Sequence, residues 1–336
     1  LAFAQALELS PRLTRASLGQ ARLALSQEGA EQAAALIQGA LEIDPKSVEA
    51  SEMLGDLNQS MGRFTEAVDA YTNALNYGRN KWMLYYKRAL ARIDVGAFDE
   101  ASADIAASEK GMRQFSGLQF ARGMLLLKQG QPDKALPEFE QFLRAGPNEP
   151  RALFYAGVAA YQSGQFEQAE EYLARFNAAY PNTMAGAQAL GLVRIGRRDF
   201  EGAEAVLSPF AQAKDPDPRI LSVYSRALAG LGRQAEAIQT LKQVVTAQPE
   251  AASPRLQLAG NLLAAGQPDA AVTELRVLLS QDQSNRAVRL LLIKALLQDK
   301  QAAAALTEAE ALSQSAPEDA EAYNALAVAL LANGQE

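Results

Sequence analysis

The sequence predicts an all-α protein in which pairs of antiparallel helices repeat every 34 residues and stack into a solenoid. The main observation is an alanine that recurs at this interval, with a small residue twelve positions before it. Small residues at both positions allow two helices to cross closely. The recurring alanines are Ala33, Ala67, Ala101, Ala135, Ala169, Ala203, Ala237, Ala271 and Ala305. The preceding positions are Ala21, Gly55, Ala89, Gly123, Gly157, Gly191, Ser225 and Ala259, with Ile293 as the exception.

Residues 150–182 show the pattern of one repeat most clearly. Each half places apolar residues at the spacing of one helix face, and Gly164 separates the halves. Pro181 ends the unit because proline cannot continue a helix. Neither helix can bury its stripe alone, so each repeat requires a neighbour. The stripes are Leu153, Ala156, Gly157 and Ala160, then Phe166, Ala169, Leu173 and Phe176.

A glycine recurs at the turn between the two helices, where a left-handed backbone conformation favours it. Three turns carry Glu28, Arg198 and Lys300 instead, so they are the least favourable of the predicted turns. A proline often follows the second helix. The glycines are Gly62, Gly96, Gly130, Gly164, Gly232, Gly266 and Gly334. The prolines are Pro11, Pro45, Pro147, Pro181, Pro249 and Pro317.

Taken in order, the chain divides into nine complete repeats over residues 14–319, with half repeats at residues 1–13 and 320–336. Residues 1–10 are expected to form the second helix of an earlier repeat, and residues 320–332 the first helix of a tenth. We therefore expect a single solenoid over residues 1–336 that is a piece of a longer one. Its two incomplete ends would expose apolar faces and could associate end to end. The complete repeats begin at Thr14, Val48, Trp82, Ser116, Pro150, Met184, Pro218, Ala252 and Arg286.

These features resemble the tetratricopeptide repeat (TPR) family over the whole chain. The resemblance rests on the 34-residue period, the order of small, glycine, alanine, aromatic and proline positions, and the turn sequences G-R-F-T-E-A at 62–67 and G-Q-F-E-Q-A at 164–169. The family's first-helix tryptophan is missing, and Tyr85 and Tyr323 come nearest to it. The resemblance implies a right-handed superhelix whose first helices line a concave groove.

Composition argues against several classes of function. The net charge of -7 disfavours nucleic acid as the main ligand, and no apolar run is long enough to insert into a membrane. The chain has no histidine, so it lacks the commonest general base and metal ligand, and it has no cysteine. It also lacks glycine-rich phosphate-binding motifs. We therefore expect neither enzymatic activity nor a cofactor nor a metal.

The remaining expectation is recognition of a protein or peptide in the concave groove. In the family, positions 2, 5, 6, 9, 12 and 13 of each first helix face this groove. Position 5 is aromatic in three consecutive repeats, at Tyr86, Phe120 and Phe154. Phe120 and Phe154 would equally serve as filling between helices. Lys87 belongs to a basic stretch over residues 79–92. The predicted groove residues are Met83, Tyr86, Lys87, Phe120, Met124, Arg151, Phe154, Tyr155, Val158 and Tyr161.

Residues 152–181 and 255–272 also resemble the long TPR lipoproteins encoded with the exosortase/PEP-CTERM sorting system and exopolysaccharide genes. This resemblance implies a bacterial periplasmic scaffold for polysaccharide or protein export, anchored to the outer membrane through an upstream lipidated cysteine. Two alternatives remain open. One is a cytoplasmic TPR co-chaperone or regulatory adaptor. The other is a carbohydrate-binding groove in which Tyr86, Phe120, Phe154 and Tyr161 act as sugar platforms.

Overall fold

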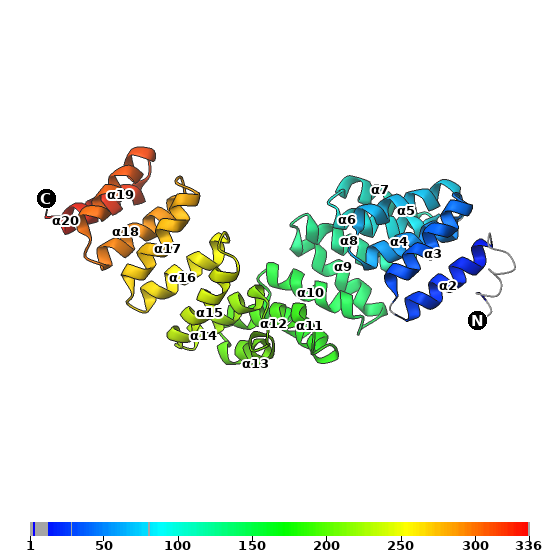
Figure 1. The fold of residues 1–336 in the computed structure, drawn as a ribbon, viewed down its shortest axis with the longest axis horizontal. Coiled ribbons are helices and arrows are strands. Elements are labelled where there is room, and N and C mark those ends of the chain that lie inside the picture. Colours follow the sequence, from blue (N-terminus) through cyan, green and yellow to red (C-terminus); the bar gives the residue numbers. More distant parts are fainter. Residues whose placement is uncertain (1–2, 4–12, 28, 80, 335–336) are drawn as a thin grey trace. The chain divides into compact units, whose positions relative to one another are not determined.

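The computed structural model describes residue 3 and residues 13–27, 29–79 and 81–334. These residues form 19 α-helices and no strand, as the sequence predicts (Figure 1). The chain divides into two compact units, Leu1–Phe176 and Asn177–Glu336. Because the chain forms two units, a single solenoid over residues 1–336 stays a prediction.

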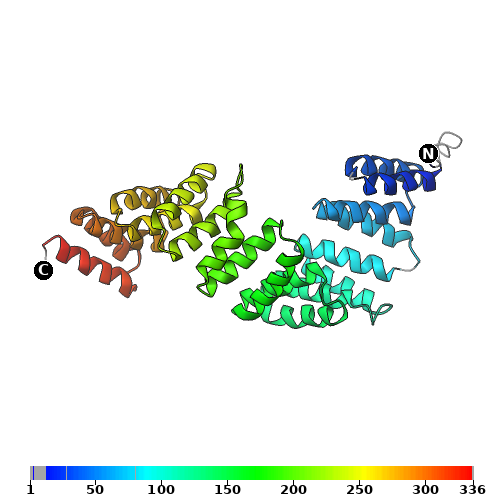
Figure 2. The same ribbon diagram turned by 90° about the horizontal axis from the view of Figure 1, so that it is seen from below.

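The first unit contains five successive helix pairs, the last of which runs across the unit boundary (Figure 2). Its helices are α2 (Thr14–Ser26), α3 (Ala30–Ile43), α4 (Val48–Ser60), α5 (Phe64–Tyr77), α6 (Trp82–Asp94), α7 (Phe98–Glu109), α8 (Gly117–Lys128), α9 (Pro132–Ala145), α10 (Pro150–Gln162) and α11 (Phe166–Ala179).

The second unit continues the same alternation and ends on an unpaired first helix. Its helices are α12 (Met184–Gly196), α13 (Phe200–Ala211), α14 (Pro218–Gly230), α15 (Gln234–Ala247), α16 (Ala252–Ala264), α17 (Pro268–Gln281), α18 (Arg286–Gln298), α19 (Ala302–Ser315) and α20 (Ala320–Ala332). Eight of the nine predicted repeat starts coincide with the first residue of a helix, and Ser116 immediately precedes α8.

Proline and its neighbours explain where some of these helices begin. Pro218 is the first residue of α14, where its missing N–H costs no helical hydrogen bond. The Asp217 side chain before it accepts a hydrogen bond from the Arg219 backbone N–H at 2.7 Å. The residues that end one repeat therefore also start the next helix.

The closest helix crossings lie where the sequence places its small residues. All nine recurring alanines are fully buried. A methyl group added at Gly157 would lie 2.5 Å from Leu173 Cγ, and one at Gly123 would lie 2.7 Å from Phe139 Cε1. The large partner thus stands sixteen positions after the small residue. The same spacing pairs Ile293 with Ala309, both buried, so the large and small roles are exchanged in this repeat.

The turns confirm the predicted left-handed conformation. All seven predicted glycines have a positive φ, between 70° and 79°. Arg198 and Lys300 adopt it as well, with φ of 62° and 59°, although a side chain disfavours it. Glu28 lies outside the described residues. The geometry of the repeat therefore determines the turn conformation even where glycine is missing.

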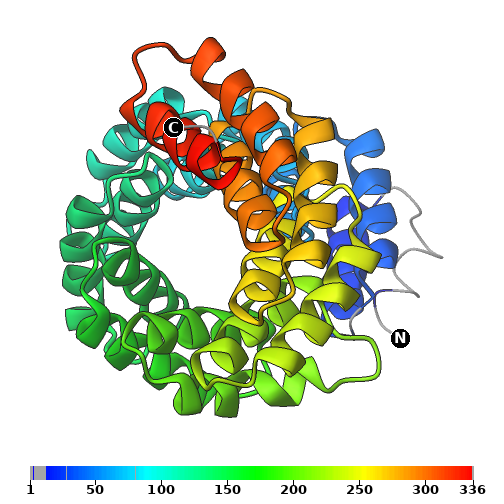
Figure 3. The ribbon, with the colours of Figure 1, turned by 90° about the vertical axis from the view of Figure 1, so that its left-hand side faces the viewer.

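Several first helices of consecutive repeats contact each other within each unit, for example α6 with α8 in the first and α18 with α20 in the second. Second helices pack against the first helix of their own repeat and of the next, as α5 does with α4 and α6. Figure 3 shows the resulting two layers of helices. Because the first helices approach one another, they form the concave layer of each unit.

Helix α20 keeps part of its apolar surface exposed. Leu326 and Leu330 pack against the core of the second unit, whereas Leu331 is 67% exposed. The helix predicted for residues 1–10 lies outside the described residues, apart from Phe3. Association through the two ends therefore stays a prediction.

Candidate partner-binding grooves

The predicted groove residues of the first unit are only partly exposed. Met83 and Arg151 are exposed, and the Lys87 side chain is half-buried. The aromatic and aliphatic members with half-buried side chains are Tyr86, Phe154, Tyr155, Val158 and Tyr161. The prediction is wrong for Phe120 and Met124, which are only 4% and 3% exposed.

Phe120 is buried because aromatic rings from two neighbouring helices surround it. Its ring centroid lies 5.8 Å from that of Phe139 and 5.5 Å from that of Phe142, both on α9. Tyr155 of α10 covers it from the next repeat at 6.0 Å. Phe120 therefore fills the space between helices, which was the alternative interpretation of this position.

The other predicted aromatics also have aromatic neighbours. Tyr155 contacts Phe154, whose ring lies 5.3 Å from that of Phe176. Tyr86 packs edge-on against Phe115, and Tyr161 packs against Phe166. The rings thus form one cluster around Tyr155 and two separate pairs. Burial raises the pKa of Tyr155, an effect that the nearby Arg151 charge opposes.

Lys87 does not present a free charge to the groove. Its ammonium group lies 2.7 Å from a Glu52 carboxylate oxygen and 2.8 Å from an Asp56 oxygen, both on α4. Burial alone would lower the pKa of Lys87, but the hydrogen bonds to Asp56 and Glu52 raise it above its usual value. Two more cations of the basic stretch, Arg88 and Arg92, bind the buried Asp104 at 2.7 and 2.6 Å. This stretch therefore serves packing between helices.

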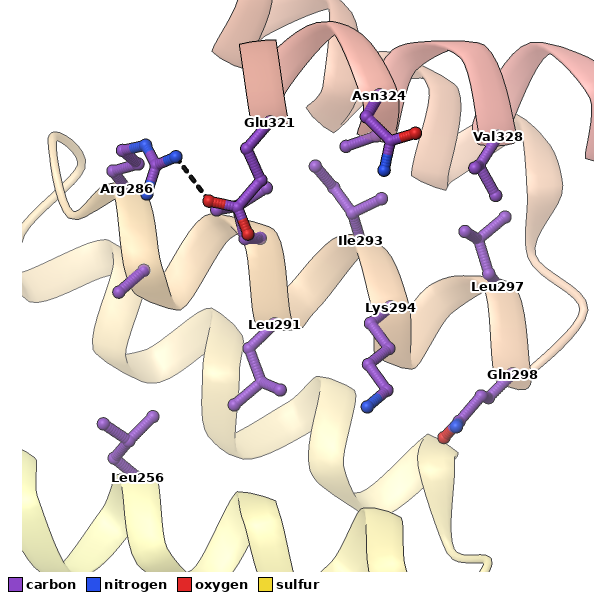
Figure 4. Close-up of a pocket in the computed structure, with 13 residues that line it drawn as sticks. Leu256, Arg286, Leu291, Ile293, Lys294, Leu297, Gln298, Glu321, Asn324 and Val328 are labelled. Carbon is purple, nitrogen blue, oxygen red and sulfur yellow. Dashed lines mark hydrogen bonds and ion pairs between the residues drawn. The ribbon is translucent and has the colours of Figure 1, made fainter. Parts of the chain in front are cut away.

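The second unit contains a groove of about 770 Å³ that the sequence analysis did not single out (Figure 4). Its walls come from the first helices α16, α18 and α20, and all lining residues except Arg286 and Ile293 occupy positions that face the concave side in the family. We call it the leucine groove. It is lined by Leu256, Arg286, Ala287, Leu290, Leu291, Ile293, Lys294, Leu297, Gln298, Glu321, Asn324, Ala325 and Val328.

The groove is apolar because α18 carries leucine on two faces. Its core face buries Leu292 and Leu296, whereas Leu290, Leu291 and Leu297 stay half-buried at the groove. Figure 4 shows Val328 of α20 facing Leu297 of α18. At the two edges, Leu256 is 39% exposed and Val328 is 45% exposed. The second leucine face of α18 was the signal in the sequence that could have indicated this groove. The predicted groove residues were instead chosen from the aromatic positions of the first unit.

Two of the charged lining residues are paired with each other. The Arg286 guanidinium lies 2.6 Å from Glu321 and also binds Asp319. Hydrogen bonds from Arg286 hold the pKa of Asp319 at about 2, below its usual value. Lys294 is exposed and has no carboxylate partner within the described part of the chain. Among those residues, no cluster of three or more acidic side chains is placed to hold a metal ion.

No helix in the described ranges combines the length and hydrophobicity needed to cross a bilayer.

The curated relatives include cellulose synthase 2 operon protein C of Komagataeibacter xylinus. It is 28% identical over 269 residues, which cover 74% of this chain and 20% of that protein. DnaJ homolog subfamily C member 3 of Homo sapiens is 23% identical over 233 residues, which cover 69% of this chain and 42% of that protein. The chain thus spans less than half the length of these relatives.

The solved structures that share the fold include the following two. A tetratricopeptide repeat protein from Parabacteroides merdae has a TM-score of 0.54 at 15% identity, over 74% of this chain and 99% of that one. The APC/C hetero-tetramer Cut9-Hcn1 has a TM-score of 0.63 at 15% identity, over 94% of this chain and 63% of that one. Two tetratricopeptide repeat family models match residues 120–182 and 189–252, and residues 228–294 and 262–330. These segments together cover more than half of the sequence, and the chain therefore belongs to the tetratricopeptide repeat family.

Proposed function

We propose that this chain is a non-catalytic scaffold that binds a protein or peptide in the leucine groove. The observation that carries the proposal is the row of exposed or half-buried aliphatic side chains on three consecutive first helices, α16, α18 and α20. Exposed apolar surface of this kind marks binding sites because covering it removes apolar area from water. Most of the lining side chains are aliphatic, and the polar ones are Lys294, Gln298, Asn324 and the paired Arg286 and Glu321.

The same lining favours a protein partner over a carbohydrate. Sugar platforms use flat aromatic rings, whereas the leucine groove is aliphatic. In the first unit, Phe120 is one of the four proposed sugar platforms and is buried. Aliphatic side chains of a partner would fill the groove with the complementarity of a protein interior.

A peptide library tests the proposal. Random peptides displayed on phage are selected on the purified chain, and the affinity of enriched peptides is measured by isothermal titration calorimetry. We expect Val328→Asp to weaken binding at least about 30-fold, because it replaces an apolar contact with Leu297 worth about 2 kcal/mol by a charge. Tyr323→Asp is the matched control, because Tyr323 is 50% exposed on the same helix but lies outside the groove. Equal affinity of both variants and the wild type would overturn the proposal.

The wider role that we propose is in bacterial export of exopolysaccharide or protein, on the periplasmic side of the outer membrane. The resemblance of residues 152–181 and 255–272 to lipoproteins of the exosortase/PEP-CTERM system supports it. The similarity to cellulose synthase 2 operon protein C agrees with a link to polysaccharide. Fractionation of cells that express the full-length gene product tests the compartment, with palmitate labelling for the lipid anchor. Recovery in the cytoplasm without lipid would favour the adaptor alternative.

A further inference from the structure

Lys294 is the charged residue of the leucine groove that stands out. It occupies position 9 of α18, with Leu290 and Leu291 before it and Leu297 after it, at helical spacings of three and four residues. Its side chain therefore leaves the helix between leucines that also line the groove (Figure 4). The corresponding residues of the neighbouring first helices, Gly260 and Val328, carry no charge.

The other cations of α18 already have partners. Arg286 binds Asp319 and Glu321 of α20. Arg289 lies 2.8 Å from Glu308 of α19 and donates to the backbone carbonyl of Gln283. Across the described residues, Lys294 has neither an ion pair nor a hydrogen bond of this kind. The unit thus satisfies the two arginines and leaves the lysine open to solvent.

A partner that covers the leucines must also deal with this ammonium group. Removing a charge from water is costly unless an opposite charge or hydrogen-bond acceptors replace the water. A carboxylate from the partner would do so and would also fix the position of the partner in the groove. Arg286 and Glu321 make no such demand, because each already has a partner of opposite charge.

We infer, on the basis of the proposed function, that the occupant is a protein segment with an aspartate or glutamate flanked on both sides by aliphatic residues. The carboxylate pairs with Lys294, and the flanking side chains contact Leu290 on one side and Leu297 on the other. These leucines lie about 6 Å and 4.5 Å from Lys294 along the helix axis, at 1.5 Å per residue. A helical partner matches this spacing with aliphatic residues three or four positions before and after its acidic residue. An extended partner matches it with aliphatic residues two positions before and after the acidic residue.

Selection on two charge variants tests this inference. The same peptide library is selected on the wild type, on Lys294→Glu and on Lys300→Glu. Lys300 is the matched control, because it is exposed in the same repeat but lies at the turn outside the groove. We expect the wild type and Lys300→Glu to enrich peptides with an acidic residue between aliphatic ones. Lys294→Glu should enrich lysine or arginine at that place.

One enriched peptide then serves as the probe in a charge-reversal experiment. Replacing its acidic residue by lysine should weaken binding to the wild type at least tenfold, and Lys294→Glu should restore most of that loss. Circular dichroism confirms that each variant is folded. An acidic preference that persists in Lys294→Glu, while Val328→Asp still weakens binding, would refute the inference and leave the proposed function standing. If no peptide is enriched, or if Val328→Asp has no effect, both are wrong.

Discussion

The exchange of large and small residues in the ninth repeat allows a direct test of how the helix pairs are packed. Elsewhere a small residue on the first helix faces a large one sixteen positions later, as Gly157 faces Leu173. In α18 and α19 the large residue is Ile293 and the small one is Ala309, both buried. If this register is correct, the two residues share one space, and changing both together should restore the normal arrangement.

The magnitudes follow from the burial of both residues. Ile293→Ala alone should destabilise the chain by about 2–5 kcal/mol, because it deletes a buried side chain. Ala309→Leu alone should cost about 1–3 kcal/mol, because it overfills the crossing. The double variant exchanges the two sizes, as in the other repeats, and should lose only about 1–2 kcal/mol. We therefore expect a favourable coupling of at least about 1 kcal/mol between the two sites.

Urea unfolding followed by circular dichroism measures the total change. Hydrogen exchange of the α18 and α19 amides localises it, because repeat proteins do not always unfold in one step. Ala303→Leu on the exposed side of α19 is the matched control and should change stability by less than about 0.5 kcal/mol. Single effects that add to within about 0.5 kcal/mol in the double variant would show that Ile293 and Ala309 do not share a space.

Three further predictions follow from the same geometry. Ala169→Leu should cost about 1–3 kcal/mol in urea unfolding, because Ala169 is fully buried at a helix crossing; unchanged stability would argue against that crossing. Lys300→Gly should stabilise the chain by about 0.5–1 kcal/mol, as measured by thermal unfolding. The left-handed conformation of Lys300 costs about 1–2 kcal/mol, and relief of this strain exceeds the entropic cost of glycine. Arg286→Ala should return the pKa of Asp319 from about 2 towards 3.8 in an NMR titration. Because this pKa is lowered on folding, the stability linked to Asp319 is present above about pH 3.8 and is lost as the pH falls towards 2.

The fold was predictable because its determinants recur at short range and at one fixed interval. A residue at the turn must adopt a left-handed conformation whatever its type, so even Arg198 and Lys300 do so. A residue at the crossing must leave room for its partner, so the alanines and glycines reveal the helix pairs. The turn conformation and the space at the crossing are both set by the path of the backbone, which repeats every 34 residues.

The candidate site was less predictable because burial depends on neighbours that the period does not specify. Phe120 and Phe154 occupy the same repeat position, yet Phe120 alone is fully enclosed, by Phe139 and Phe142. Whether Lys87 offers a free charge to the groove depends in the same way on its neighbours, because Glu52 and Asp56 of the preceding repeat pair with it. Equal positions in a repeat therefore do not imply equal exposure.

The leucine groove shows where a repeat protein departs from its own average. Every first helix needs one apolar face for the core, and α18 has a second one with Lys294 in it. Gly260 of α16 faces open space, where an added methyl group would meet no atom within 4 Å, so no large side chain covers the groove from that position. The core exchange at Ile293 falls in the same helix. Since the shared pattern already accounts for the fold, these departures in α18 are the features that require a functional explanation, and a partner with aliphatic and acidic side chains provides one.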